Sequence, residues 1–241
     1  MSSAEPKSPF RSRGFIAAAI VIGVIVLAAI IVLVGGLFRD DNDTAPAPTA
    51  TTTATPTIDE ADVSICGLPG HDTENTLTAA PNNDWELVGT VAAPTDPDGA
   101  GPGVVEETFR TCFAHTAEGA LFAAVNAIAA STDSRNAPRM WELLADGPAK
   151  DTVQASGSNS GTAPSNARLQ VAGFKVNNYT SDEATIDLAL SVTSEGGALV
   201  SYPTVLRWED GDWKVVLTEN GAPIAPGPLT NLGGYLVWAG V

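Results

Sequence analysis

An uncharged apolar run over residues 14–38 constrains this chain more than any other feature of its sequence. As a helix the run would be about 37 Å long, enough to span a hydrocarbon core of about 30 Å with some tilt. A cleaved signal peptide is the main alternative, but its apolar region usually extends over about 7–15 residues and ends at a small-residue cleavage site. Here the run is longer than that, and it ends at Arg39-Asp40-Asp41 with no Ala-x-Ala cleavage pattern. We therefore expect an uncleaved transmembrane helix over 14–38.

The charges that flank this run predict its orientation. Lys7, Arg11 and Arg13 precede it, whereas acidic residues follow Arg39. Positive charge stays on the cytoplasmic side, so residues 1–13 are expected to be cytoplasmic and the rest of the chain to lie outside the cell membrane. The chain has a net charge of −16, which makes direct contact between the exported domain and nucleic acid unfavourable.

Beyond the run, composition divides the chain into three segments. Residues 39–57 are rich in Thr, Ala and Pro and hold nothing large to bury, so they are predicted to form a disordered linker. Segment 58–110 has many Pro, Gly and Asp and no helical period, which predicts an irregular wrap with one short strand over 85–91. We expect an α+β domain over 111–241. Its apolar tail should cover one end of the sheet, with binding to a partner as the alternative.

The first part of this domain predicts a helical layer. Thr116 is suited to cap a helix that begins one residue later. Three large residues then recur at helical spacing and predict a face toward the core: Leu121, Val125 and Ile128. A second helix is expected over 137–146 and a short third helix after Pro148.

After a flexible loop at 157–167 the hydrophobic period changes to two. Residues 184–192 alternate apolar and polar side chains, which predicts a strand with one buried face. The preceding strand, 168–177, changes phase at Ala172-Gly173, which indicates a bulge and curvature.

The last two predicted strands meet at Asp210-Gly211, a strong hairpin signal that pairs Trp208 with Trp213. A further hairpin near 194–198 needs an odd loop length to keep the apolar faces together. The predicted architecture is α+β, a helical layer packed on a curved four-stranded antiparallel sheet.

Cys66 and Cys112 both lie on the expected outer side, where disulfides form. A bond between them would tie the wrap to the first helix and stabilise the fold by about 4 kcal/mol in the chain-entropy treatment. Two free buried thiols are the alternative.

The histidine, cysteine and acidic residues of the sequence do not form a catalytic or metal-binding motif. His71 and His115 are far apart, and neither His-x-x-x-His nor Cys-x-x-Cys occurs. Asp210 and Asp212 flank a hairpin glycine, as turn residues do. We therefore expect a non-catalytic protein with no cofactor and no metal site.

Aromatic side chains are the candidates for an interaction surface. Trp208 and Trp213 form either a buried cross-strand pair or a surface that stacks on a ligand. The tail adds two further candidates, Tyr235 and Trp238.

Three stretches carry a resemblance to a known group of proteins: Gly-Ala-Leu-Phe-Ala-Ala at 119–124, Arg-Leu-Gln-Val-Ala-Gly-Phe-Lys-Val at 168–176, and Leu-Arg-Trp-Glu-Asp-Gly-Asp-Trp-Lys-Val at 206–215. Together with the membrane run, Cys66-Gly67-Leu68 and Cys112-Phe113-Ala114, they make the chain resemble membrane proteins of actinobacterial conjugative and integrative elements. Those proteins have an exported cystatin-like cone domain, similar to that of the bitopic assembly factor of type IV secretion systems and to the nuclear-transport-factor-like superfamily.

The resemblance covers about residues 110–220 and the membrane run, while segment 58–110 and the apolar tail depart from it. It implies a scaffold or accessory subunit of a conjugal DNA-transfer apparatus, which contacts itself or other envelope proteins. The alternative is an extracytoplasmic module that binds an apolar small ligand or a cell-wall component. The even-numbered face of residues 184–192 is wholly apolar, which disfavours an acid–base enzyme but not a binder of an apolar ligand.

Overall fold

The computed structural model describes residues 60–156 and 168–239, which all belong to one unit of the chain, Pro56–Val241. Four of the segments discussed above lie outside the described residues: 1–13, 14–38, 39–57 and 157–167. Among the helices that are described, none is long and apolar enough to cross a membrane.

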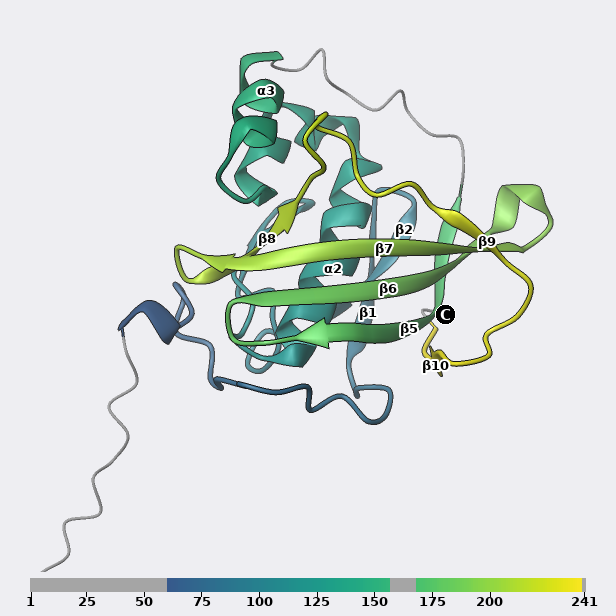
Figure 1. Ribbon diagram of the computed structural model, residues 1–241, viewed down its shortest axis with the longest axis horizontal. Coiled ribbons are helices and arrows are strands. Elements are labelled where there is room, and N and C mark those ends of the chain that lie inside the picture. The colour runs from purple at the N-terminus through teal and green to yellow at the C-terminus, as the bar shows by residue number, and fades with distance from the viewer. Residues whose placement is uncertain (1–59, 157–167, 240–241) are drawn as a thin grey trace, which may run out of the picture. The chain divides into compact units, whose positions relative to one another are not determined.

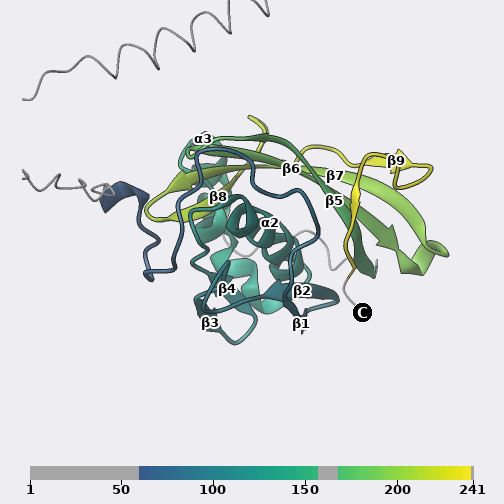
Figure 2. The same ribbon diagram turned by 90° about the horizontal axis from the view of Figure 1, so that it is seen from below.

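The described residues form an α+β domain with three layers: a sheet, the helix α2, and a pair of small hairpins on the far side of that helix (Figure 1, Figure 2). The elements follow in the order η2 Glu60–Asp62, β1 Asp84–Val88, β2 Val91–Thr95, β3 Val104–Glu106, β4 Phe109–Thr111, α2 Ala117–Ser131, η3 Ser134–Leu143, α3 Pro148–Ser156, β5 Leu169–Tyr179, β6 Glu183–Val192, η5 Thr193–Glu195, β7 Ala198–Glu209, β8 Asp212–Val216, β9 Gly227–Leu229 and β10 Leu236–Val237.

The main sheet is antiparallel and has six strands. Strands β5, β6, β7 and β8 follow one another as neighbours and form the predicted four-stranded part. The C-terminal tail adds a short strand at each edge: β9 pairs with β7, and β10 pairs with β5. The tail was expected to cover one end of the sheet, and it instead extends the sheet at both edges. The strand number of four is therefore wrong, because backbone pairing by the tail leaves no signal in the hydrophobic period.

The register of the strand pairs agrees with the turns and the bulge that the sequence predicts. Asp210 and Gly211 both have positive φ, as the two central residues of a tight hairpin turn require, and Trp208 lies opposite Trp213. Strand β5 shifts register between Val171 and Gly173, where the phase change predicted a bulge, and shifts again after Val176. The β6–β7 loop is 193–197, an odd number of residues as expected.

The observed helices agree in part with those predicted from the sequence. α2 begins at Ala117, with the Thr116 hydroxyl accepting a hydrogen bond from Gly119 N at 3.0 Å. The short helix predicted after Pro148 is α3, which begins at Pro148 itself. The helix expected over 137–146 is instead the 3₁₀ helix η3. Asp133 accepts a hydrogen bond from Arg135 N at 3.0 Å, so this side chain caps the element earlier than the sequence suggested.

Segment 58–110 contains two hairpins. The single strand expected over 85–91 is a hairpin of β1 and β2, because the chain turns at Gly89-Thr90. Strands β3 and β4 form the second hairpin. Asn126 of α2 donates a hydrogen bond to Pro94 O at 3.1 Å, which joins the first hairpin to the helix.

A buried irregular segment, 112–115, connects β4 to α2. The Asp212 carboxylate accepts hydrogen bonds from Cys112 N at 3.0 Å and Phe113 N at 2.9 Å. Trp213 donates its indole N–H to Ala114 O at 3.0 Å. The structure also contains the disulfide between Cys66 and Cys112, with their Cα atoms 6.1 Å apart. The β7–β8 hairpin therefore holds the start of α2 through its side chains.

We expect Asp212→Asn to lower the free energy of unfolding by about 1–3 kcal/mol, because an amide nitrogen replaces one of the two acceptor oxygens and leaves a buried N–H unpaired. Urea denaturation measures this loss. Asp210→Asn is the matched control: Asp210 is exposed, and Asn tolerates its positive φ. Equal stability of the two variants would contradict a structural role for the Asp212 carboxylate.

Candidate functional site

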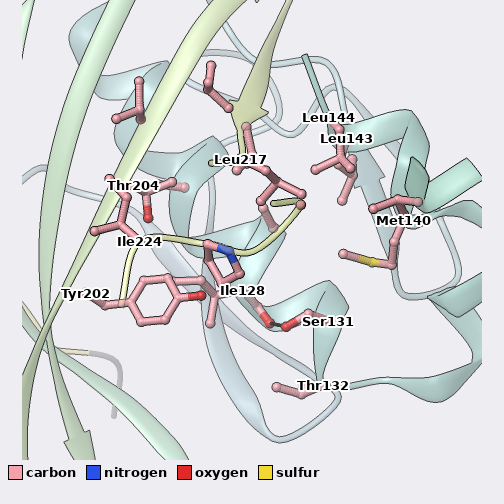
Figure 3. Close-up of a pocket in the computed structure, with 18 of the residues that line it drawn as sticks. Ile128, Ser131, Thr132, Met140, Leu143, Leu144, Tyr202, Thr204, Leu217 and Ile224 are labelled. Atoms are coloured by element: carbon pink, nitrogen blue, oxygen red, sulfur yellow. Dashed lines mark hydrogen bonds between the residues drawn. The ribbon is translucent and has the colours of Figure 1, made fainter. Parts of the chain in front are cut away.

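A cavity of 620 Å³ lies between the second half of α2, η3, β7 and the chain that follows β8 (Figure 3). Its volume falls in the range of small-molecule sites, about 300–1,000 Å³. Large apolar side chains from each of these elements line it: Ile128, Met140, Leu143, Tyr202, Leu217 and Ile224.

The cavity opens where the edge of β7 has no neighbouring strand among the described residues. Strand β8 pairs with β7 only as far as Val205, and β9 resumes the pairing at Ser201. Pro203 lies in this gap, where a missing N–H costs no ladder hydrogen bond at the edge. Because β8 ends at Val216, residues 217–224 leave the sheet and pass along the cavity.

Small residues on α2 leave the space on the opposite side. Ala124 and Ala127 line the cavity, with Ile128 beside them. A helix face of alanines next to a bent sheet cannot fill the volume that larger side chains would occupy. The alanine-rich composition of this part of α2 therefore produces a hollow.

One polar atom in the cavity wall lacks a partner. The Thr204 side chain is 6% exposed, and its hydroxyl has no hydrogen-bond partner among the described residues. Burial of an unpaired hydroxyl costs about 1–3 kcal/mol. A ligand that offers a hydrogen-bonding group at this position would recover that cost.

Two ionisable side chains belong to the lining, Asp133 and Tyr202. Hydrogen bonds from the Arg135 side chain hold the pKa of Asp133 well below its usual range, so this carboxylate is already engaged. Burial raises the pKa of the Tyr202 phenol, which stays neutral at physiological pH. In Figure 3 the hydroxyl end of Tyr202 points toward α2. The cavity therefore favours an uncharged ligand.

The four aromatic residues singled out in the sequence do not share one surface. Trp213 and Trp238 are core residues, 3% and 5% exposed. Trp238 packs against Trp85 at a centroid distance of 4.7 Å, while Trp213 forms the expected cross-strand pair with Trp208 at 5.4 Å. Trp208 is only partly exposed.

Tyr235 is also partly exposed and lies on the outer face of the sheet. Its hydroxyl donates a hydrogen bond to Asp187 at 2.7 Å, and the Lys175 ammonium lies 4.9 Å from its ring centre. These contacts anchor the tail. Of the four aromatics, only Trp208 and Tyr235 remain candidates for surface contacts.

The cavity was not predicted from the sequence, although one feature of β7 points to it. Positions 200, 202, 204 and 206 share the face of β7 that the hairpin register turns inward. In that face Thr204 lies between Tyr202 and Leu206, so a small polar residue stands among large, mainly apolar side chains. The gap at the strand edge, which creates the hollow, has no counterpart in the residue pattern.

We expect Thr204→Val to stabilise the ligand-free protein by about 1 kcal/mol, since it removes the unpaired hydroxyl and keeps the shape of the side chain. Urea denaturation measures the change, and Thr185→Val on the half-exposed face of β6 is the matched control. Destabilisation by Thr204→Val would show that the hydroxyl has a partner in the ligand-free state.

Comparison with known proteins places the chain in a family. A family described as "Domain of unknown function (DUF8175)" matches residues 44–237. No curated protein and no solved structure matches the chain. Because the family match extends over well more than half of the sequence, the chain belongs to the DUF8175 family.

Proposed function

We propose that this protein is a membrane-anchored, non-catalytic envelope protein whose exported domain binds an apolar small ligand. The observation that carries the proposal is the 620 Å³ cavity with its mainly apolar lining and the buried Thr204 hydroxyl, which has no partner among the described residues. Binding sites of this kind are mostly apolar, with a few polar groups that orient the ligand.

The lining favours a particular class of ligand. An acyl or isoprenoid chain would fill the space between Ile128, Met140 and Leu217, while a hydroxyl or carbonyl group on that chain would meet Thr204. A charged headgroup fits less well, because it would lose its hydration without a counter-ion in the lining.

The arrangement of the lining also supports a role without turnover. Acid–base catalysis needs a titratable group that faces the substrate with a pKa near the working pH. The Asp133 carboxylate is engaged by Arg135 and has a lowered pKa, and the Tyr202 phenol has a raised one. Neither group is tuned for proton transfer near neutral pH.

We assign the domain to the cystatin-like cone class as part of this proposal. In support, α2 packs against one face of a bent antiparallel sheet (Figure 2), and residues of both line the cavity. The disulfide between Cys66 and Cys112 supports a location outside the cytoplasm, where disulfides persist. The apolar run over 14–38 would supply the single-pass anchor.

A photoreactive long-chain alcohol tests the ligand proposal in membranes that contain the full chain. After irradiation, mass spectrometry of peptides should locate the adducts on α2, η3 and the chain after β8. Ala127→Phe fills the cavity and should reduce labelling at least about tenfold, which corresponds to about 1.4 kcal/mol of binding. Ala155→Phe, on the exposed side of α3, is the matched control and should label as the native chain does.

Two outcomes would overturn the proposal. Adducts spread over the outer surface would indicate partitioning of the probe rather than a site. Equal labelling of Ala127→Phe and the native chain would show that the probe does not enter the cavity.

A second function, a scaffold or accessory subunit of a conjugal DNA-transfer apparatus, is favoured by a separate observation. Apolar side chains are exposed around the disulfide: Val63, Ile65, Val104 and Val105, at 43%, 71%, 38% and 50%. Ile65 adjoins Cys66, and Val104 pairs with Thr111 next to Cys112. Exposed apolar groups that gather in one region favour contact with another protein or a second copy.

We expect a photocrosslinking residue at position 65 to join the domain to itself or to other envelope proteins, and one at exposed Glu219 to give no such product. Deletion of the gene should lower DNA transfer, and the native gene should restore it. Unchanged transfer on deletion would exclude this second function and leave the ligand-binding proposal standing.

A further inference from the structure

The two histidines of the chain, distant in sequence, meet in the fold. His71 and His115 form a parallel β-bridge, and their ring centres lie 4.6 Å apart. Asp62, at the end of η2, brings its carboxylate between them: Oδ1 lies 3.7 Å from His71 Nε2 and 3.9 Å from His115 Nδ1. We propose that Asp62, His71 and His115 form a binding site for a zinc-like divalent metal ion.

The spacing of the donor atoms suits a small ion. One donor atom from each residue lies within 4.8 Å of the other two. Ligand atoms about 2.0–2.1 Å from a tetrahedral zinc ion are separated by about 3.4 Å. Because the two imidazole rings stack at an interplanar angle of 22°, coordination of one ion also requires the more exposed ring, His71, to turn toward Asp62.

His71 provides the observation that favours a ligand over a purely structural cluster. Its Nε2 atom is buried and has no hydrogen-bond partner among the described residues, although the side chain as a whole is 24% exposed. Buried polar atoms without partners are rare and costly. An ion at this position would satisfy Nε2 through its lone pair.

His115 is oriented as a metal ligand usually is. Its Nε2 atom donates a hydrogen bond to Ser181 O at 2.6 Å, which fixes the ring and directs Nδ1 toward Asp62. Without an ion, Nδ1 donates a hydrogen bond to the main-chain oxygen of Asp62 at 2.9 Å. An ion would take the place of a proton on Nδ1, with this oxygen or water completing the coordination.

Trp208 supports the arrangement from the other side. Its ring stacks on His115 with centroids 3.8 Å apart and an interplanar angle of 3°. Its indole N–H donates a hydrogen bond to Ala61 O at 2.8 Å, which holds the residue before Asp62 in place. His115 is fully buried, whereas Asp62 and His71 are partly exposed, so an ion can enter from their side.

The donor set selects the class of ion. Two imidazole nitrogens and one carboxylate oxygen suit zinc and neighbouring first-row ions, whereas calcium and magnesium prefer oxygen ligands alone. The site precedes the N-terminal end of α2, and the apolar cavity lies along the second half of that helix. Metal binding is therefore separate from the proposed binding of an apolar ligand.

Calorimetric titration of the full chain with zinc tests the site, using detergent-purified protein without a polyhistidine tag and treated with a chelator. We expect one zinc ion per chain, and a rise in Tm of about 5–10 °C at saturating zinc. Calcium at the same concentration should neither bind at this stoichiometry nor raise the Tm. Cobalt, as a spectroscopic substitute, should show the intense d–d absorption of a four-coordinate site.

His71→Ala should weaken zinc binding at least about a hundredfold, because it removes a direct ligand. Asp62→Asn should weaken it as well, while Glu74→Gln, an exposed carboxylate in the same region, should bind as the native chain does. Circular dichroism confirms that each variant is folded. Two results would overturn the proposal. Unchanged zinc binding by His71→Ala would assign the ion to the acidic surface, and an equal response to calcium would show that the site does not select zinc.

Discussion

The buried segment 112–115 is the constraint on which the rest of the domain depends. It is irregular, yet its four residues are almost completely inaccessible, so each main-chain group needs a partner inside the protein. Asp212 and Trp213 supply hydrogen bonds from the β7–β8 hairpin. Gly103 N donates to Cys112 O at 2.7 Å, and the Ser64 hydroxyl donates to Phe113 O at 3.0 Å. Sheet, hairpins and N-terminal wrap are thereby joined where α2 begins.

This anchoring places α2 so that its two ends face different environments. At the N-terminal end, His115 is held between His71 and Trp208. Along the second half, alanines face a part of β7 that no described strand covers at its edge, and the cavity follows from that mismatch. The proposed metal site and the proposed ligand site are thus consequences of one helix fixed at its start.

Much of the fold was predictable because its signals are local. The cap at Thr116, the turn at Asp210-Gly211 and the phase change before Gly173 each depend on neighbouring residues, and the structure confirms all three. The helix predicted over 137–146 is found in part: it is the 3₁₀ helix Ser134–Leu143, which begins earlier because Asp133, a residue outside the apolar pattern, caps it. The two tail strands, β9 and β10, were missed because they are short and pair through their backbone alone.

The sequence by itself determined the α+β class, the order of the central strands and the register of the β7–β8 hairpin, since apolar periodicity and turn residues act over a few positions. Only the tertiary structure decided the burial of Trp213 and Trp238, the hollow beside Thr204 and the meeting of Asp62, His71 and His115. Spacing rules for metal and catalytic sites work when the ligands share one element. Here the three side chains come from three separate segments, and the contacts that unite them form only when the chain packs around 112–115.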